Sequence, residues 1–158
     1  MASAVGFPAA QVAFSRLGTG TGMLEYGAFA DPAASATALA VECGTHFARA
    51  SGELAIQAAL RFLIHHGTIA RATVDDALAP EPDERPQFYD VTEVYVARHD
   101  GARFVRSFAG FEELASGEPI LVDGDATLVA PFDRCAILMP RPAVRRGGEM
   151  VTLARLVD

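Results

Sequence analysis

A carboxylate, an imidazole and a guanidinium lie close together in one short stretch of the sequence, at Glu42, His46 and Arg49. Glu42 ends the apolar run Thr37–Glu42, and the Cys43-Gly44 pair after it favours a turn. A carboxylate at the C-terminal end of a buried strand lies where α/β sheets hold their active sites, and there it can serve as a general base. The other interpretation is a glutamate that ends a strand and points into solvent. His46 and Arg49 are candidate site-adjacent residues, although a lone histidine is also a common structural residue.

No complete catalytic or metal-binding motif accompanies these residues. The sequence has no His-Glu-x-x-His and no His-x-x-Glu pair, because His65, His66 and His99 also lack the downstream glutamate. His65 and His66 are adjacent rather than four apart, which makes a poor ligand pair on a helix. The glycine-rich stretch 18–22 lacks both a lysine and the dinucleotide spacing. The sequence therefore predicts no metal ligands on this chain.

The basic residues narrow the chemistry further. All 13 of them are arginine, since the sequence contains no lysine. This excludes Schiff-base catalysis, a phosphate-loop lysine, and covalent attachment of biotin or lipoate. A guanidinium does not deprotonate, so arginine cannot replace lysine as an amine nucleophile.

Composition and charge indicate a folded soluble protein. Apolar residues make up 51 % of the chain, and the formal net charge is −7. A nucleic-acid binder would need a basic face to release counterions, so no nucleic-acid partner is expected. No apolar run reaches the length of a membrane span. Cys43 and Cys135 fit no metal or redox spacing, which favours a reduced cytoplasmic protein.

The elements that must position Glu42 are predicted in residues 1–69. Short strands are expected at Gln11–Phe14 and Thr37–Glu42, and a helix at Ser51–His66 with Gly67 as its cap. Polar residues spaced by four form one narrow stripe on this helix, and the rest of its circumference is apolar, so it must be covered on several sides. We infer a partial α/β layer, completed by another segment, a partner chain or a second copy. The alternative is that this helix packs directly on the β domain.

The second half of the chain has a different pattern. Pro80, Pro82 and Pro86 predict an extended, acid-rich linker over 70–88. In 89–158 the period changes to two, and short apolar runs separated by turns predict a small antiparallel β barrel or sandwich. The expected strands are Val91–Ala97, Arg103–Phe108, Pro119–Val122, Thr127–Ala130, Ala136–Met139 and Glu149–Leu156.

Six blocks along the chain resemble, in order, a known enzyme family. Leu39-Ala-Val-Glu-Cys-Gly-Thr-His46 and the helix Ala58–Ile69 resemble the Glu-Cys-Gly block and following helix of the succinylglutamate desuccinylase/aspartoacylase family. The later blocks resemble its C-terminal β domain, and the likeness covers roughly residues 23–157. These later blocks are Phe108–Phe111, Ser116–Ile120, Ala130–Asp133 and Ile137–Pro140.

This resemblance implies both a fold and an activity. Family members have a carboxypeptidase-like α/β domain with one zinc ion, and they hydrolyse the amide of N-acylated amino acids or related small amides. Glu42 matches the glutamate that acts as general base on zinc-bound water and then returns the proton to the departing amine. The implied fold is the C-terminal portion of the α/β layer followed by the β domain.

The chain also departs from the family pattern. The His-x-x-Glu pair and the later histidine that hold zinc, and the substrate-binding arginines, have no counterpart in this sequence. The chain alone is therefore expected to be inactive, with zinc and a small N-acyl amino acid bound only in a complete enzyme. The alternatives are a non-catalytic binding or oligomerisation module, with a homo-oligomer covering the apolar helix, and an aggregation-prone fragment.

Overall fold

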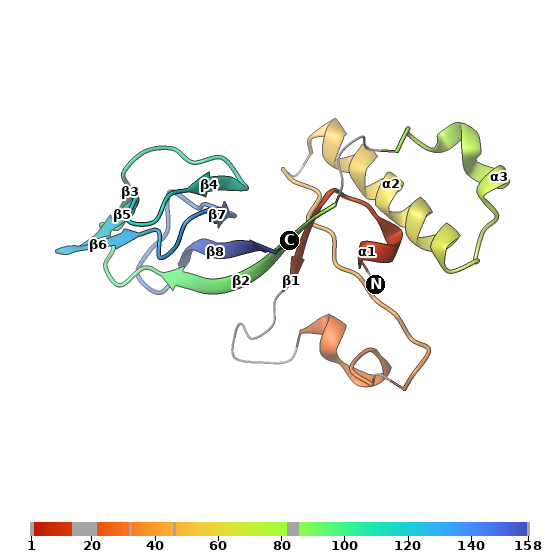
Figure 1. Cartoon of the computed structure of the whole chain (residues 1–158), viewed down its shortest axis with the longest axis horizontal. Helices are drawn as coiled ribbons and strands as arrows, with labels where there is room; N and C mark the ends of the chain where they lie inside the picture. Colours follow the sequence, from red (N-terminus) through yellow and green to blue (C-terminus); the bar gives the residue numbers. More distant parts are fainter. Residues whose placement is uncertain (1, 14–21, 32, 46, 82–85, 158) are drawn as a thin grey trace. The chain divides into compact units, whose positions relative to one another are not determined.

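The computed structural model describes residues 2–13, 22–31, 33–45, 47–81 and 86–157 (Figure 1). The chain divides into two compact units. Within the described residues, the first unit holds 2–11 and everything from 22 to 86, and the second unit holds 12–13 and 87–157.

The first unit is built around one long helix, α2 (Arg49–His65), which confirms the predicted helix. Its end follows from Gly67, whose φ of +66° suits a residue without a side chain. The Gly67 N–H donates to the Ile64 carbonyl at 2.9 Å, and the Thr68 N–H donates to the Leu63 carbonyl at 2.9 Å. These two bonds form the Schellman motif that commonly ends helices. The other helices of the unit are short: α1 Ala2–Val5, η1 Met23–Glu25, η2 Gly27–Phe29, α3 Arg71–Val74 and η3 Asp75–Ala77.

The polar stripe of α2 holds the chain that follows the helix. The Gln57 side chain donates to the Ala77 carbonyl at 2.8 Å and accepts from the Ala79 N–H at 2.9 Å. The Arg61 guanidinium donates to the Ala79 carbonyl at 2.8 Å and is itself buried. The prediction that the apolar remainder of α2 is well covered is met only in part, because Ile56 is 58 % exposed.

The predicted strand Thr37–Glu42 is not formed, and residues 36–44 have no regular secondary structure. A strand is defined by hydrogen bonds to a neighbouring strand, and the described part of the chain supplies none for this segment. Burial alternates only in the second half of this segment: Ala40 and Glu42 are exposed and Leu39, Val41 and Cys43 are partly buried, whereas Ala36, Thr37 and Ala38 are all partly buried.

The predicted linker 70–88 contains more regular structure than expected. It begins with α3 and η3, and its last two residues already belong to strand β2 (Gln87–Val96). The prediction of an extended crossover is therefore wrong for 71–77. The reason is that all three prolines come after Ala77, so nothing prevents helical turns before them.

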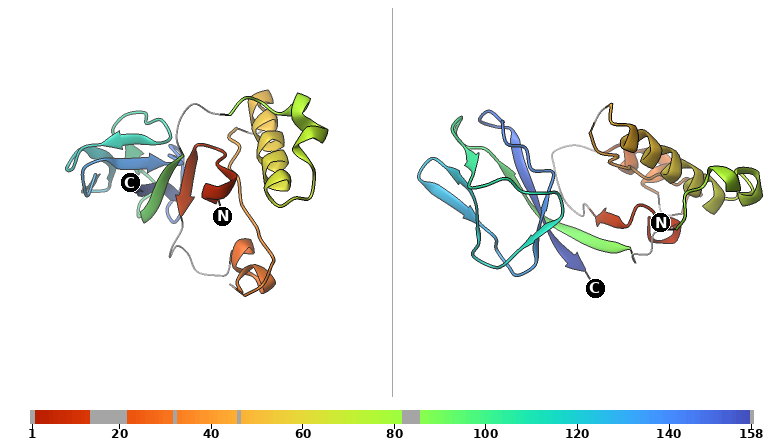
Figure 2. Two further views of the ribbon diagram at one scale, coloured as in Figure 1. Left: turned by 45° about the vertical axis from the view of Figure 1, so that its right-hand side comes forward. Right: turned by 90° about the horizontal axis from the view of Figure 1, so that it is seen from above.

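The second unit is an antiparallel β structure, as the period-two pattern predicts. A five-stranded sheet has the strand order β1-β2-β8-β7-β4, and a three-stranded sheet has the order β3-β5-β6. Of edge strand β1, Val12 and Ala13 belong to this second unit. The long strands β2 and β8 lie side by side (Figure 2). Besides β2, the strands are β1 Ala10–Ala13, β3 Arg103–Phe104, β4 Glu112–Leu114, β5 Pro119–Asp123, β6 Ala126–Val129, β7 Cys135–Leu138 and β8 Glu149–Val157.

One hydrophobic core draws side chains from both sheets. Ile120 and Leu121 of β5 meet Ile137 of β7 and Met150 and Leu153 of β8, and all five are fully buried. Neither strand order closes on itself among the described residues, so the choice between barrel and sandwich stays a prediction.

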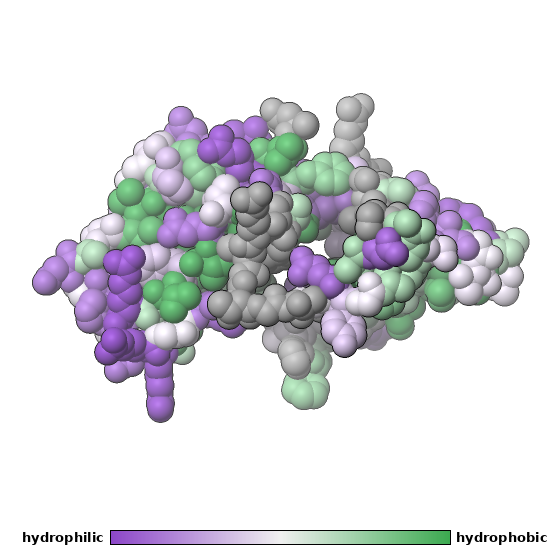
Figure 3. All heavy atoms as spheres, turned by 90° about the horizontal axis from the view of Figure 1, so that it is seen from below, coloured by the Kyte–Doolittle hydropathy of each residue, from purple (hydrophilic) through white to green (hydrophobic). Residues whose placement is uncertain are grey.

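Apolar side chains also reach the surface, where they are interspersed with charged ones (Figure 3). None of the helices in the described residues combines the length and the apolar character that crossing a membrane would need.

Candidate functional site

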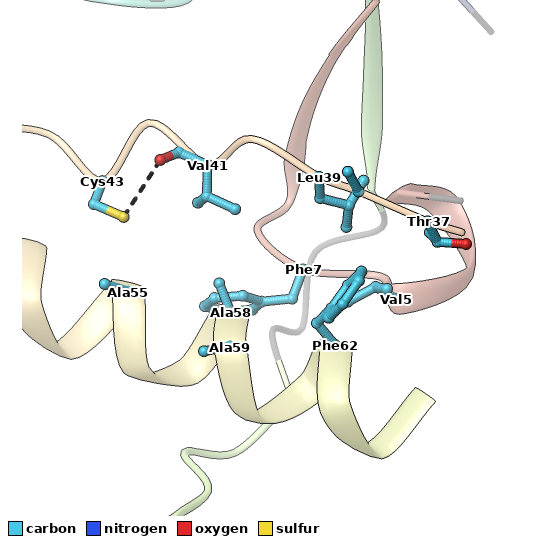
Figure 4. Close-up of a pocket in the computed structure, with 11 residues that line it drawn as sticks. Val5, Phe7, Thr37, Leu39, Val41, Cys43, Ala55, Ala58, Ala59 and Phe62 are labelled. Atoms are coloured by element: carbon cyan, nitrogen blue, oxygen red, sulfur yellow. Dashed lines mark hydrogen bonds between the residues drawn. The ribbon is translucent and has the colours of Figure 1, made fainter. Parts of the chain in front are cut away.

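Glu42 is an exposed residue of the extended segment 36–44. This segment runs along α2 (Figure 4). Thr37, Leu39, Val41 and Cys43 line a pocket that α2 also lines, whereas Glu42 takes no part in its lining and is exposed. Successive side chains of an extended chain point to opposite faces. The Glu42 carboxylate therefore faces away from the pocket.

The pocket itself is apolar and has a volume of about 440 Å³. Its helix side consists of Ala55, Ala58, Ala59 and Phe62, and no charged side chain lines it. The Cys43 thiol donates to the Val41 carbonyl at 3.6 Å (Figure 4). Such a lining suits an apolar group and cannot neutralise the charges of an N-acyl amino acid.

The turn after Glu42 is fixed by a glycine and a serine. Gly44 has a φ of +100°, which an L side chain rarely adopts. The Ser51 hydroxyl in the first turn of α2 donates to the Thr45 carbonyl at 2.8 Å, which holds the turn against the helix. Phe47 also has a positive φ, +66°, and its side chain is fully exposed. A bulky residue in this conformation is uncommon, and such strain is concentrated at functional loops.

No contact among the described residues joins the predicted site residues to one another. Arg49, the first residue of α2, pairs with Glu53 at 2.7 Å, and both side chains are largely exposed. Glu42 has no hydrogen bond or ion pair within the part of the chain that the structure describes. His46 lies outside the described residues.

The described histidines do not form a metal site. His65 and His66 lie at the C-terminal end of α2. Their rings are edge to face, and the two ring centroids are 5.0 Å apart. Nowhere in the described residues do three His, Cys, Asp or Glu side chains cluster as metal ligands would. The residues that the structure describes therefore do not fit a zinc ion.

The second unit holds a polar cluster that sequence analysis missed. The Asp123 side chain, which is buried, accepts from the Tyr95 hydroxyl at 2.9 Å, the Arg98 N–H at 2.7 Å and His99 Nδ1 at 2.8 Å. The bond from the Arg98 N–H contributes most to lowering the pKa of Asp123, to about 2 from the usual 3.8, with help from His99 and Tyr95. The sequence analysis did not single out Asp123, because no local pattern marks its long-range partners.

The ionised Asp123 fixes the state of His99. A carboxylate can only accept, so Nδ1 of His99 carries the proton and Nε2 is directed away from Asp123. The ring lies so close to Gly124 that a Cβ there would come within 2.8 Å of it. The His99 side chain is 62 % exposed. This cluster ties the turn after β2 to the turn after β5.

Several solved structures are similar to this chain, among them two from Vibrio species. No protein-family model and no curated protein sequence matches the chain. Succinylglutamate desuccinylase from Vibrio parahaemolyticus is similar over 63 % of this chain and 27 % of its own, with 26 % identity and a TM-score of 0.47. The enzyme of the same name from Vibrio cholerae is similar over 68 % of this chain and 31 % of its own, with 24 % identity and a TM-score of 0.48. The matched part thus spans less than a third of either structure.

Proposed function

We propose that this chain contributes the general base of a zinc-dependent hydrolase that cleaves the amide of N-acylated amino acids or similar small amides. The ordered sequence blocks around Glu42 and in the β domain support this family assignment. The observation that carries the role of Glu42 is its placement. The exposed Glu42 lies near the end of an extended segment and two residues before Gly44, in the turn that leads into α2.

The chemistry of Glu42 follows from its surroundings. Glu42 is exposed, and no cation pairs with its carboxylate among the described residues. A general base must accept a proton from water and release it to the leaving amine, which a carboxylate locked in an ion pair does less well. Among the described residues, Arg49 pairs with Glu53 and not with Glu42.

Zinc would have to be held by residues other than those described here. Within the described residues no three His, Cys, Asp or Glu side chains cluster as metal ligands would, and Nδ1 of His99 is bonded to Asp123. We therefore propose that the metal ligands and the groups that bind the small substrate lie outside the described residues. No reaction step beyond proton transfer at Glu42 is assigned to this chain.

A substitution at Glu42 tests the role. The chain would be affinity-purified from its source cells together with whatever it binds, and release of glutamate from N-succinylglutamate would be measured. The Glu42→Gln variant keeps the shape of the side chain but cannot accept a proton, so we expect a loss of about 10²–10⁴-fold in kcat. Glu53→Gln, on the face that carries Arg49, is the matched control. Unchanged activity of Glu42→Gln, or an equal loss in Glu53→Gln, would reject the role.

The second candidate is a non-catalytic binding or oligomerisation module. The apolar pocket and the extended segment without a neighbouring strand favour it. This function predicts that Glu42→Gln leaves assembly intact and that no preparation hydrolyses the amide.

A further inference from the structure

The two oxygens of the Asp123 carboxylate have different partners. Oδ2 accepts hydrogen bonds from the Tyr95 hydroxyl and the Arg98 N–H, whereas Oδ1 accepts from His99 Nδ1 at 2.8 Å. The proton of the neutral imidazole is therefore on Nδ1, and Nε2 carries the free lone pair. Nε2 makes no hydrogen bond within the residues that the structure describes. It is thus the nitrogen that can attack an electrophile.

The turn that carries His99 is fixed by hydrogen bonds and by close packing. The Ala102 N–H donates to the His99 carbonyl at 3.2 Å, and the Arg146 N–H donates to the Asp100 carboxylate at 2.8 Å. The ring lies against Gly124, where a Cβ would come within 2.8 Å of the ring atom Cε1. The imidazole is therefore held in place before any reactant arrives, although 62 % of its side chain is exposed.

The buried carboxylate should make Nε2 a better nucleophile. When Nε2 forms a bond to carbon, the ring becomes positively charged. Asp123 is 1 % exposed, and its pKa is lowered to about 2, so its negative charge lies at hydrogen-bond distance from that cation. The aspartate of Ser-His-Asp enzymes stabilises an imidazolium in the same way. His65 and His66 offer a contrast, since neither is bonded to a carboxylate among the described residues.

We propose that His99 and Asp123 form a nucleophilic dyad that hydrolyses small neutral esters with good leaving groups. His99 is the catalytic residue, and Asp123 is the residue that positions it. The substrate class follows from the surroundings of the ring. The neighbours of His99 in the chain, Arg98 and Asp100, have opposite charges, so neither an anion nor a cation is favoured. An imidazole this exposed selects its substrate by electrophilicity and not by shape. The dyad does not depend on Glu42 or on zinc.

The reaction has two steps. Nε2 of His99 attacks the carbonyl carbon of the ester, and the new N–C bond forms as the C–O bond to the leaving group breaks. The leaving group departs as a phenolate with the electron pair of the broken bond. The acyl-imidazolium keeps its proton on Nδ1, bonded to Asp123. Water then attacks the acyl carbon, the N–C bond breaks, and its electron pair returns to Nε2 while the carboxylic acid leaves and ionises in solvent.

Hydrolysis of p-nitrophenyl acetate by the full chain tests the activity. Release of p-nitrophenolate would be followed in the presence of EDTA at about pH 8, where an ordinary imidazole is neutral. His99→Gln removes the nucleophile, so we expect kcat/KM to fall about tenfold or more. His65→Gln is the matched control, because it also removes one exposed imidazole but none that is bonded to a carboxylate among the described residues. Its kcat/KM should stay within roughly twofold of the wild type.

Two measurements test the part played by Asp123. Asp123→Asn keeps an acceptor for Nδ1 but removes the charge, so we expect kcat/KM to fall about tenfold in a variant that circular dichroism shows to be folded. Diethyl pyrocarbonate, a neutral acylating reagent, needs no variant. In the wild type it should modify His99 about tenfold faster than His65 or His66, measured by peptide mass spectrometry. Nitrogen-15 NMR of the wild type should show the proton of neutral His99 on Nδ1.

Loss of hydrolysis in His99→Gln, together with the fastest acylation at His99, supports the proposal. Hydrolysis that persists in His99→Gln overturns it, as does an equal loss in His65→Gln. Acylation of His99 no faster than that of His65 and His66 also overturns it. A folded Asp123→Asn chain with the wild-type rate, or a neutral His99 with its proton on Nε2, would show that the carboxylate does not activate the ring.

Discussion

The Asp123 cluster gives the sharpest stability prediction, through the substitution Tyr95→Phe. The Tyr95 hydroxyl donates at 2.9 Å to a carboxylate that is 1 % exposed, and Tyr95 itself is 8 % exposed. Water cannot easily replace this donor in the folded state. Hydrogen bonds to charged groups contribute about 1.5–3 kcal/mol, so the free energy of unfolding of the second unit should fall by about 2 kcal/mol. For a unit of this size, that corresponds to a drop in Tm of roughly 8–16 °C.

The same substitution should alter the response to acid. Folding lowers the pKa of Asp123 from 3.8 to about 2. The ionised carboxylate therefore stabilises the fold at pH values above the pKa of the unfolded chain. This stabilisation is lost as the pH falls through the pKa of the folded chain. The wild type should therefore lose stability as the pH falls from roughly 4 to 2. Tyr95→Phe removes one of the bonds that lower the pKa, so the variant should lose less over this interval.

Thermal and urea unfolding, followed by far-UV circular dichroism at pH 7 and pH 3, would measure both effects. Tyr26→Phe is the control, because Tyr26 is 73 % exposed, and its Tm should change little. A Tm of Tyr95→Phe equal to that of the control would refute the reasoning. So would an acid response identical to that of the wild type.

Three further substitutions test local features of the fold. Gln57→Ala removes two bonds to 77–79, so we expect a loss of about 1–2 kcal/mol and faster protease cleavage near 77–81. Gly124→Ala should destabilise the second unit strongly, because φ at this position is +62° and the new Cβ would lie 2.8 Å from the His99 ring. Adding His99→Ala should remove the steric part of this loss in stability. A double-mutant cycle, measured by urea unfolding, would detect the difference. Gly67→Ala also has a positive φ of +66° but meets no atom within 4 Å, so thermal unfolding should show only the backbone cost of about 1 kcal/mol.

The parts of the fold that depend on local pattern were predictable from the sequence. α2 was placed to within two residues, because its polar stripe and Gly67 are encoded within the helix and its cap. β5, β6, β7 and β8 were found because alternation and turn residues are also local. The short strand β4 was missed, and β3 is shorter than the predicted Arg103–Phe108.

The remaining features depend on partners far away in the sequence. Thr37–Glu42 has the composition of a strand, but the described chain offers no strand beside it. Gln57 and Arg61 belong to the polar stripe of α2. The structure shows that their side chains bind the backbone of 77–80, which the pattern of the helix alone does not predict. Asp123 is joined to Tyr95 across 28 positions. Of the candidate site, the role of Glu42 stays a prediction, and its position on the face opposite the pocket required the structure.

Zinc binding by the isolated chain tests the central claim most directly, namely that this chain supplies the general base but not the metal ligands. The purified chain would be incubated with one equivalent of zinc, desalted, and analysed by elemental mass spectrometry. The proposal predicts almost no zinc retained, both in the wild type and in Glu42→Gln. Retention of about one zinc per chain, lost in Glu42→Gln, would contradict it, because Glu42 would then be a metal ligand and not a base.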